Sequence, residues 1–387
     1  MEIDAISLFE PECGEREIEL VCAVLQSTRW GDGPMLEGFE QAFAGWVGRR
    51  HAVAVGSGTL GTWIALRAMG IGPGDEVLCT SHAWHQVAQA ITLAGATPVF
   101  ADINYWTGSI NVEKAALKIS PRTRAILAGN TNGHPADWEP LRALADMHGL
   151  KLIEDSTEAF GSRYRGQCVG SFGDVSVFDF SLPSALSTGE GGMLVTDDED
   201  LVHELRYLRQ RRIADRNSVS VGSRVPLQAG MSELTAALGL AQLAGLDERL
   251  AIRKEVEGWY QDQMQSFEGV KPPYIGEHVE EVNWMLYVVH LGKRFSASAR
   301  AQMIDDLKSS GIETAAYSHP LHQQYYYMHA GETIGRQRGL LRDTDRIGDR
   351  ALALPLHTQL DATQVQYIVT TLKDTATNVG AGAAIYL

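Results

Sequence analysis

The chain has 387 residues, 44% of them hydrophobic, and its 33 basic and 48 acidic side chains give a formal net charge of −15. This composition excludes a disordered or collagen-like chain and supplies enough apolar residues for a large core. The acidic balance argues against nucleic-acid binding, because phosphate backbones are held by clustered Lys and Arg side chains. We therefore expect no nucleic-acid partner.

No apolar run approaches the roughly 18 residues that a membrane span requires, and acidic residues stand near the N-terminus where a signal peptide carries basic ones. We therefore expect a cytoplasmic protein with no membrane association. The four cysteines are scattered without C-x-x-C spacing. The sequence thus predicts neither a disulfide framework nor a metal site.

Between about residue 50 and residue 200, short apolar runs alternate with helical patterns, which is typical of a sheet wrapped by crossover helices. The predicted fold class is therefore α/β, with a mostly parallel central sheet in a large domain. In chain order the expected segments are strand 51–55, helix 59–70, strand 75–81, helix 85–95, strand 97–103, strand 124–130, helix 140–149, strand 151–156, strand 173–180 and strand 191–198.

From about Met231 the pattern changes to long amphipathic helices, followed by short strands and helices. We place a domain boundary near Leu246. Residues 1–246 are expected to form the large domain, with an N-terminal arm and the functional cleft. Residues 247–387 are expected to form a smaller C-terminal α/β domain with a tail.

Several blocks between about Pro11 and Lys373 resemble, in order, the DegT/StrS family of sugar aminotransferases. They include FEQAFAGWVGRRHAVAVGSGT, LKLIEDSTEA, STGEGGMLVTDD, MSELTAALGLAQLAGLDE, YSHPLH and LALPLH. The resemblance implies the aspartate-aminotransferase-like fold of pyridoxal-phosphate enzymes. It also implies a homodimer with shared active sites, and a pathway of deoxysugar, cell-surface glycan or antibiotic biosynthesis.

Three matched positions agree with that family. Ser57, Gly58 and Thr59 stand where backbone amides at a helix N-terminus hold the cofactor phosphate, although a plain glycine turn has the same pattern. Trp84 matches the aromatic residue that stacks on the pyridine ring; a core tryptophan is the alternative. Asp155 matches the acid that pairs with the pyridine nitrogen, or it caps the following helix.

Other matched positions differ. Ser184 stands in place of the Schiff-base lysine, and a hydroxyl cannot form an imine; no lysine occurs between Lys151 and Lys254. Asp179 replaces a phosphate-binding serine, and Gln228 replaces an asparagine that the partner subunit lends.

The cleft of this chain is predicted to carry a negative charge, where the cleft of the family receives a negatively charged cofactor. Glu158 adds a carboxylate near the phenolic oxygen of the family's cofactor, so that Asp155, Glu158 and Asp179 meet in one cleft. Such a cleft prefers a cation, such as an amine or an amino sugar, over a dianion. We therefore expect no cofactor and a PLP-independent reaction on an amine, such as acyl transfer or condensation. The alternative is that Asp179 turns to the surface or caps a helix.

Two histidines of one loop, His82 and His85, are candidate general bases, and His85 is taken as the catalytic one. Ser184 is a candidate nucleophile, although most serines in turns only bond the backbone. Asp155 and Glu158 are the other two candidate catalytic residues. His322, in the YSHPLH block, is expected to lie near the substrate, together with Trp84.

Two other functions stay open from the sequence. The chain either binds PLP or PMP (pyridoxamine phosphate) noncovalently, as a lysine-less sugar dehydratase or transaminase, or it is an inactive subunit that pairs with an active homologue. The first needs compensation for both the missing lysine and the altered phosphate site.

Overall fold

The computed structural model describes residues 5–31, 33–209, 225–265, 267, 269–317, 319–329 and 340–384. Its helices are α1 (Glu15–Ser27), α2 (Pro34–Val47), α3 (Gly58–Ala68), α4 (His85–Leu93), α5 (Val112–Ala116), α6 (Trp138–His148), α7 (Glu199–Arg209), α8 (Glu233–Ala244), α9 (Leu246–Met264), α10 (Ala297–Ser309), α11 (Tyr325–His329), α12 (Arg342–Arg350) and α13 (Ala362–Ala384). Its strands are β1 (His51–Val55), β2 (Glu76–Thr80), β3 (Thr97–Ala101), β4 (Thr123–Gly129), β5 (Lys151–Asp155), β6 (Arg163–Tyr164), β7 (Gln167–Cys168), β8 (Val175–Asp179), β9 (Gly192–Thr196), β10 (Val270–Lys271), β11 (Val279–Glu281), β12 (Tyr287–Leu291), β13 (Ala315–Ala316) and β14 (Ala351–Leu354).

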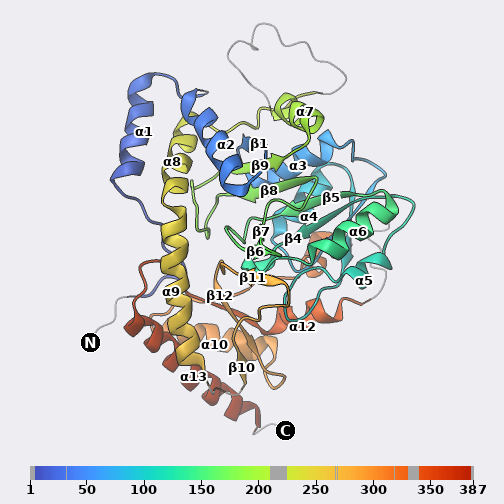
Figure 1. Ribbon diagram of the computed structural model, residues 1–387. Coiled ribbons are helices and arrows are strands. Elements are labelled where there is room, and N and C mark those ends of the chain that lie inside the picture. Colours follow the sequence, from blue (N-terminus) through green and yellow to red (C-terminus); the bar gives the residue numbers. More distant parts are fainter. Residues whose placement is uncertain are drawn as a thin grey trace.

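A seven-stranded sheet with the order β1-β9-β8-β5-β4-β2-β3 forms the centre of the molecule (Figure 1). β9 pairs antiparallel with β1 and β8, whereas the remaining pairs are parallel. The predicted α/β fold class with a mostly parallel sheet is therefore confirmed. The strands read as short, nearly continuous apolar runs because helices cover both faces of such a sheet.

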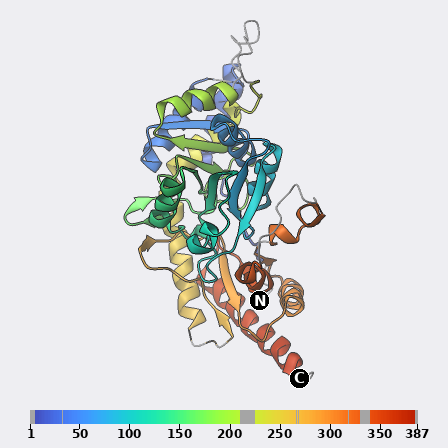
Figure 2. The ribbon, with the colours of Figure 1, turned by 90° about the vertical axis from the view of Figure 1, so that its right-hand side faces the viewer.

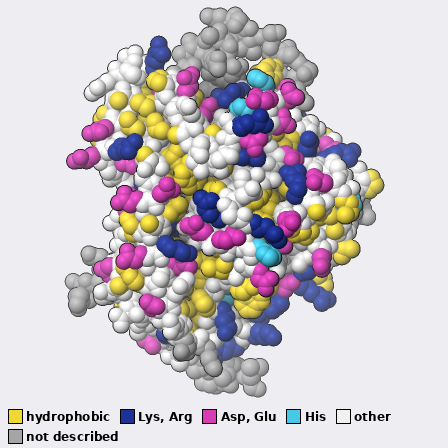
Figure 3. Space-filling view, viewed as in Figure 1, with side chains coloured by type: hydrophobic (Ala, Val, Ile, Leu, Met, Phe, Trp, Pro, Cys, Tyr) yellow, Lys and Arg dark blue, Asp and Glu magenta, His cyan; other side chains and the backbone are white. Residues whose placement is uncertain are grey.

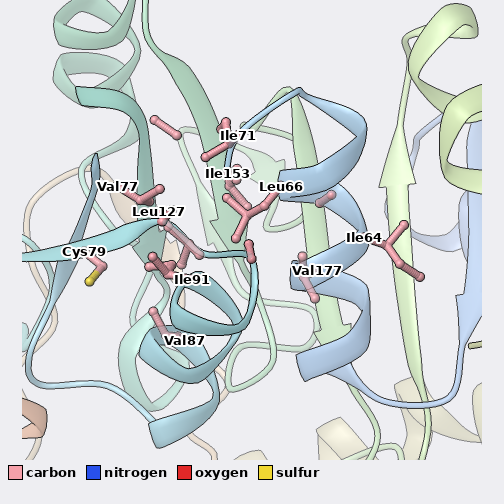
Figure 4. Close-up of a cluster of buried hydrophobic side chains, with 14 of the residues drawn as sticks. Ile64, Leu66, Ile71, Val77, Cys79, Val87, Ile91, Leu127, Ile153 and Val177 are labelled. Carbon is pink, nitrogen blue, oxygen red and sulfur yellow. The ribbon is translucent and has the colours of Figure 1, made fainter. Parts of the chain in front are cut away.

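The main core lies between this sheet and the helices α3 and α4 (Figure 4). The helices contribute fully or almost fully buried aliphatic side chains, which meet those of four parallel strands. Among them are Ile64, Leu66, Val77, Val87, Ile91, Leu127, Ile153 and Val177. This packing fixes the helix N-termini relative to the carboxyl ends of the strands.

A second core belongs to the C-terminal elements, which gather at one end of the molecule (Figure 2). There the sheet β10-β12-β14-β13 packs with α9, α10 and α13. Ile6 joins this second core, and its amide donates to the carbonyl of Gly311 at 2.8 Å. The N-terminal arm, expected with the large domain, thus packs on C-terminal residues, and the division at residue 246 stays a prediction.

The first of the long helices expected after Met231 is α8, against which α1 and α2 pack. Ser232 begins α8 by accepting the amide of Thr235 at 3.2 Å, while Glu233 accepts the amides of Met35 and Leu36 at 3.0 and 2.7 Å. Within the described ranges, no helix has both the length and the apolar character to cross a membrane. On the face shown in Figure 3, acidic and basic side chains are interspersed.

The carboxylate of Glu154 connects the ends of the central strands. Its side chain is fully buried in β5, and its two oxygens accept hydrogen bonds from amides of the turn after β7 and from polar side chains of neighbouring strand ends. The donors are Asn130 at 2.9 Å, Ser156 at 2.8 Å, Gly170 at 2.6 Å, Phe172 at 2.8 Å, Gly173 at 3.2 Å and Ser176 at 2.9 Å. Because each of its two oxygens accepts three hydrogen bonds, this buried carboxylate holds the strand ends in place.

Replacing Glu154 by Gln is expected to destabilise the fold. The new amide group would place N–H donors against backbone N–H donors in a site that excludes water, so we expect a loss of about 2 to 4 kcal/mol. Urea denaturation at neutral pH measures the loss. Glu255→Gln, on an exposed position of α9, is the control and is expected to change stability by less than about 0.5 kcal/mol. Equal stability of the two variants would contradict the role of Glu154.

Candidate functional site

A pocket opens at the carboxyl ends of β2, β4 and β5, where open α/β sheets bind their ligands. It contains about 330 Å³ of empty space, including space open to solvent. Its lining residues are Thr80, Ala83, Trp84, Val87, Leu127, Gly129, Asn130, Thr131, Asp155 and Glu158. Three of the residues selected from the sequence, Trp84, Asp155 and Glu158, therefore share one pocket.

Asp155 is the last residue of β5, directly after Glu154. Because side chains alternate along a strand, the two carboxylates point to opposite faces of the sheet. Asp155 accepts the amide of Thr157 at 3.1 Å. Burial raises the pKa of Asp155 to about 6, since ionisation is costly where water is excluded.

Glu158 accepts hydrogen bonds from the amide of Asn132 and from the hydroxyl of Tyr317. Burial is the largest cause that raises its pKa to about 7, while these donors and the Trp84 side chain act in the opposite direction. Glu158 also lines a second cavity, which contains Ser184. Its carboxyl group is thus shared by the pocket that contains Asp155 and by the cavity beside Ser184.

Trp84 precedes α4 and is half-buried in the pocket wall, so it is not a simple core tryptophan. His85, the first residue of α4, is exposed and is not among the residues that line the pocket. His82 is buried, with its ring 5.4 Å from that of Tyr317, and burial lowers its pKa to about 3. Of the two candidate bases, the buried one is therefore neutral, and a catalytic role for His85 stays a prediction.

The segment Ser57-Gly58-Thr59 forms the start of α3, as the resemblance implies. Ser57 caps the helix by accepting the amide of Leu60 at 3.2 Å. Asp179, at the end of β8, accepts the amide of Gly58 at 2.6 Å. The alternative in which Asp179 caps a helix is the arrangement that the structure has, and this helix is the one that begins at the expected phosphate site.

Ser184 is buried, and its hydroxyl donates to the carbonyl of Leu186 at 2.7 Å. This is the backbone-bonded arrangement common for serines in turns, and a role as nucleophile stays a prediction. Beside it, the buried guanidinium of Arg253 donates to the carbonyls of Leu356, Trp284 and Met285 at 2.6 to 2.8 Å. The sequence suggested an acidic cleft. At Ser184, however, the cleft also contains the positive charge of Arg253.

The other two predicted residues lie outside this pocket. His322 is held at both ring nitrogens, by the hydroxyl of Ser81 at 2.6 Å and by the carboxylate of Asp345 at 3.0 Å. Gln228 is exposed next to Ala229, whose carbonyl accepts the amide of Gly56 just before α3. Its place beside the Gly58 end of the cleft suits the predicted contact from a partner subunit, which stays a prediction.

Sequence reasoning missed Tyr317 and Asn132 as partners of Glu158. Tyr317 belongs to the YSHPLH block, whose final histidine was selected instead. Asn132 has a φ of 51°, a conformation that asparagine tolerates better than most residues, and its side-chain amide donates to the carbonyl of Leu286 at 3.1 Å. The Asn-Gly pair at 132 and 133 was the available signal, because it marks a tight turn.

Comparison with known proteins identifies the aminotransferase family that the sequence motifs resemble, and the match extends over almost the whole chain. The profile of the DegT/DnrJ/EryC1/StrS aminotransferase family matches residues 11–373. GDP-perosamine synthase of Caulobacter vibrioides is 36% identical over 374 residues, which cover 96% of this chain and 98% of that protein.

Solved structures agree in fold. DesV of S. venezuelae, solved in complex with a ketimine intermediate, is 31% identical with a TM-score of 0.88, covering 97% of this chain and 99% of that one. Spr1654 of Streptococcus pneumoniae, in its PLP-form, is 25% identical with a TM-score of 0.89, covering 97% of this chain and 99% of that one. These matches place the chain among enzymes that use the cofactor PLP.

The expectation that the chain needs no cofactor is therefore wrong. The family and its structural neighbours are PLP-dependent aminotransferases, and structures with the cofactor bound are among them. The ring end of the pocket fits such a group, because a carboxylate and an aromatic wall face the same space. The error arose from interpreting three carboxylates as one charged cleft, whereas two of them, Asp179 and Glu158, accept several hydrogen bonds from the chain itself.

Asp155 and Glu158 are expected to make the cofactor-free protein less stable as pH rises. Both folded-state pKa values, about 6 and about 7, lie above the ordinary values, so their stabilising contribution is complete at about pH 4 and is lost as pH rises through about 7. Asp155→Asn and Glu158→Gln should lose less stability than the wild type between about pH 5 and pH 8, by about 1 to 2 kcal/mol each. Urea denaturation at both pH values measures this, and parallel pH dependence of wild type and variants would contradict it.

Proposed function

Because this chain belongs to the DegT/DnrJ/EryC1/StrS aminotransferase family, we propose that it binds PLP or PMP without a covalent bond and acts with it on a small sugar substrate. The observation that carries this proposal is the shared pocket of Trp84, Asp155 and Glu158 at the strand ends. The relatives that match the chain include a GDP-perosamine synthase, which supports a place in amino-sugar biosynthesis. Both a transaminase and a dehydratase are compatible with this pocket.

In this proposal Ser184 stands where the family has its Schiff-base lysine. Its buried hydroxyl bonds a backbone carbonyl and cannot form an imine. The lysines that flank this part of the sequence lie elsewhere: Lys151 is exposed at the start of β5, and Lys254 bonds the carbonyl of Val282 at 3.0 Å. The cofactor is therefore held by contacts alone.

Asp155 and Trp84 would hold the cofactor ring. When bound, the cofactor supplies an electron sink for bonds next to an amine carbon. A pyridinium nitrogen would pair with the Asp155 carboxylate and favour its ionised form, which offsets the cost of burying that charge. The half-buried Trp84 excludes water from one side of the pocket.

Glu158 is the group proposed to hold or release a proton in place of the missing lysine. It lies between the pocket of Asp155 and the cavity of Ser184, and its pKa of about 7 suits proton transfer near neutral pH. The Tyr317 hydroxyl donates to it and keeps it oriented. The carboxyl groups of Asp155 and Glu158 complement an amine. We therefore propose that the site prefers PMP, which carries an amino group, over PLP, which does not.

Direct binding tests the proposal. We expect the purified wild-type protein to bind PMP in equilibrium dialysis. The absorbance of the cofactor at about 330 nm measures the bound amount. Asp155→Asn should weaken binding by about tenfold or more, because a charge-assisted hydrogen bond is lost. Asp102→Asn, which removes a buried carboxylate outside the pocket, should leave affinity unchanged.

If neither PMP nor PLP binds, the proposed function is wrong. Binding that appears only after a second family member copurifies with the chain would instead favour the inactive-subunit function. A homodimer with shared sites is the assembly that we propose, and the exposed Gln228 is its predicted contribution across the interface.

Restoring the lysine should restore a covalent bond to PLP. We expect the double variant Ser184→Lys/Asp179→Ser to gain an absorbance band at about 410 to 430 nm with PLP, whereas the wild type shows none. Asp179→Ser combined with Ser187→Lys is the matched control, because Ser187 lies in the same loop but bonds the carbonyl of Phe180. A double variant without the band would show that Ser184 does not occupy the lysine position.

A further inference from the structure

The carboxylate of Asp179 lies where the phosphate of the family's cofactor is expected. Asp179 ends β8 opposite Gly192 of β9 and is only 3% exposed. One carboxylate oxygen accepts the amide of Gly58 at 2.6 Å, and the other accepts the amide of Ser181 at 2.8 Å and the Ser181 hydroxyl. Donors from two separate segments thus fix the carboxylate at the start of α3.

The side chain of Asp179 packs directly against Gly58 and occupies its amide. Even a Cβ atom at position 58 would lie 2.7 Å from both the Cβ and the bonded oxygen of Asp179. The Ser57 hydroxyl already accepts the Leu60 amide. The free amides and the dipole of a helix N-terminus stabilise an anion there, and a second anion in contact with the first is repelled.

The carboxylate belongs to the same cleft as the ring pocket. Burial is the main cause of the raised pKa of Asp155, and the negative charge of Asp179 adds to it. Asp179 therefore acts on the residue proposed to hold the cofactor ring. Asp155 lies opposite Val177 in the parallel pair of β5 and β8, and Asp179, two residues further along β8, points to the same face of the sheet.

We propose that Asp179 is a specificity-determining residue that removes the preference of this cleft for a phosphorylated cofactor. Pyridoxamine, which has the same ring and amine but no phosphate, then binds about as well as PMP. The inference rests on the proposed function, because it requires the ring of a vitamin B6 compound to enter the pocket of Asp155. A phosphate reaches the Gly58 amide only by displacing Asp179, and the bonds that it forms replace bonds that the chain already has.

Dissociation constants of pyridoxamine and PMP, measured by equilibrium dialysis, test the proposal. For the wild type we expect the two constants to agree within about threefold. In Asp179→Ser the freed amide and the new hydroxyl should make PMP the tighter ligand by about tenfold or more, with little change for pyridoxamine. Asp179→Asn, which keeps the shape of the side chain, provides a second variant in case the serine variant does not fold. It should shift the ratio in the same direction, and Asp102→Asn should leave the ratio at its wild-type value.

The outcomes separate this inference from the proposed function. A wild type that already prefers PMP by about tenfold or more, or variants that leave the ratio unchanged, would overturn the role of Asp179 while PMP binding itself still stands. If neither compound binds to the wild type or to any variant, the inference and the proposed function both fail.

Discussion

The buried carboxylate of Glu154 is the constraint on which the cleft depends. It accepts donors from the turn at 170–173, from Ser176 and Ser156, and from Asn130, so that the ends of β4, β5 and β8 are held by one charge. Asn130 in turn accepts the Trp138 indole at 2.9 Å. Asp155 follows Glu154 directly, and its place in the pocket is therefore set by a neighbour that never faces the ligand.

The three carboxylates of the cleft differ in how fully the chain compensates them. Asp179 has two backbone amides and a hydroxyl, and Glu158 has an amide and the Tyr317 hydroxyl. For Asp155 the donors come from Thr157 alone among the described residues, through its amide at 3.1 Å and its side chain. A buried anion gains most from a cationic partner where its own donors are fewest. Asp155 is thus the carboxylate that we propose to pair with a pyridinium, which is the role that the resemblance implied for it.

The cofactor expectation failed for a related reason. The replacements at positions 179 and 184 are inferred from the resemblance of the surrounding motif, and each is proposed to remove one function of the family's site. Neither replacement alters the pocket wall formed by Trp84 or the strand end that carries Asp155. Losing a covalent link and a phosphate contact changes how a cofactor is held, whereas the ring position depends on other elements of the fold.

The sequence by itself determined the α/β class, most of the order of strands and helices between residues 51 and 198, and the family, because apolar periodicity and ordered motif blocks are local properties of the chain. It also located Trp84, Asp155 and Glu158, which lie at or near strand ends that a parallel sheet brings to one edge. Only the tertiary structure decided what each side chain contacts: Asp179 on the Gly58 amide, His322 between Ser81 and Asp345, and Tyr317 on Glu158. These partners are more than 100 residues apart in most cases, and a hydrogen bond depends on distances and angles that packing alone sets.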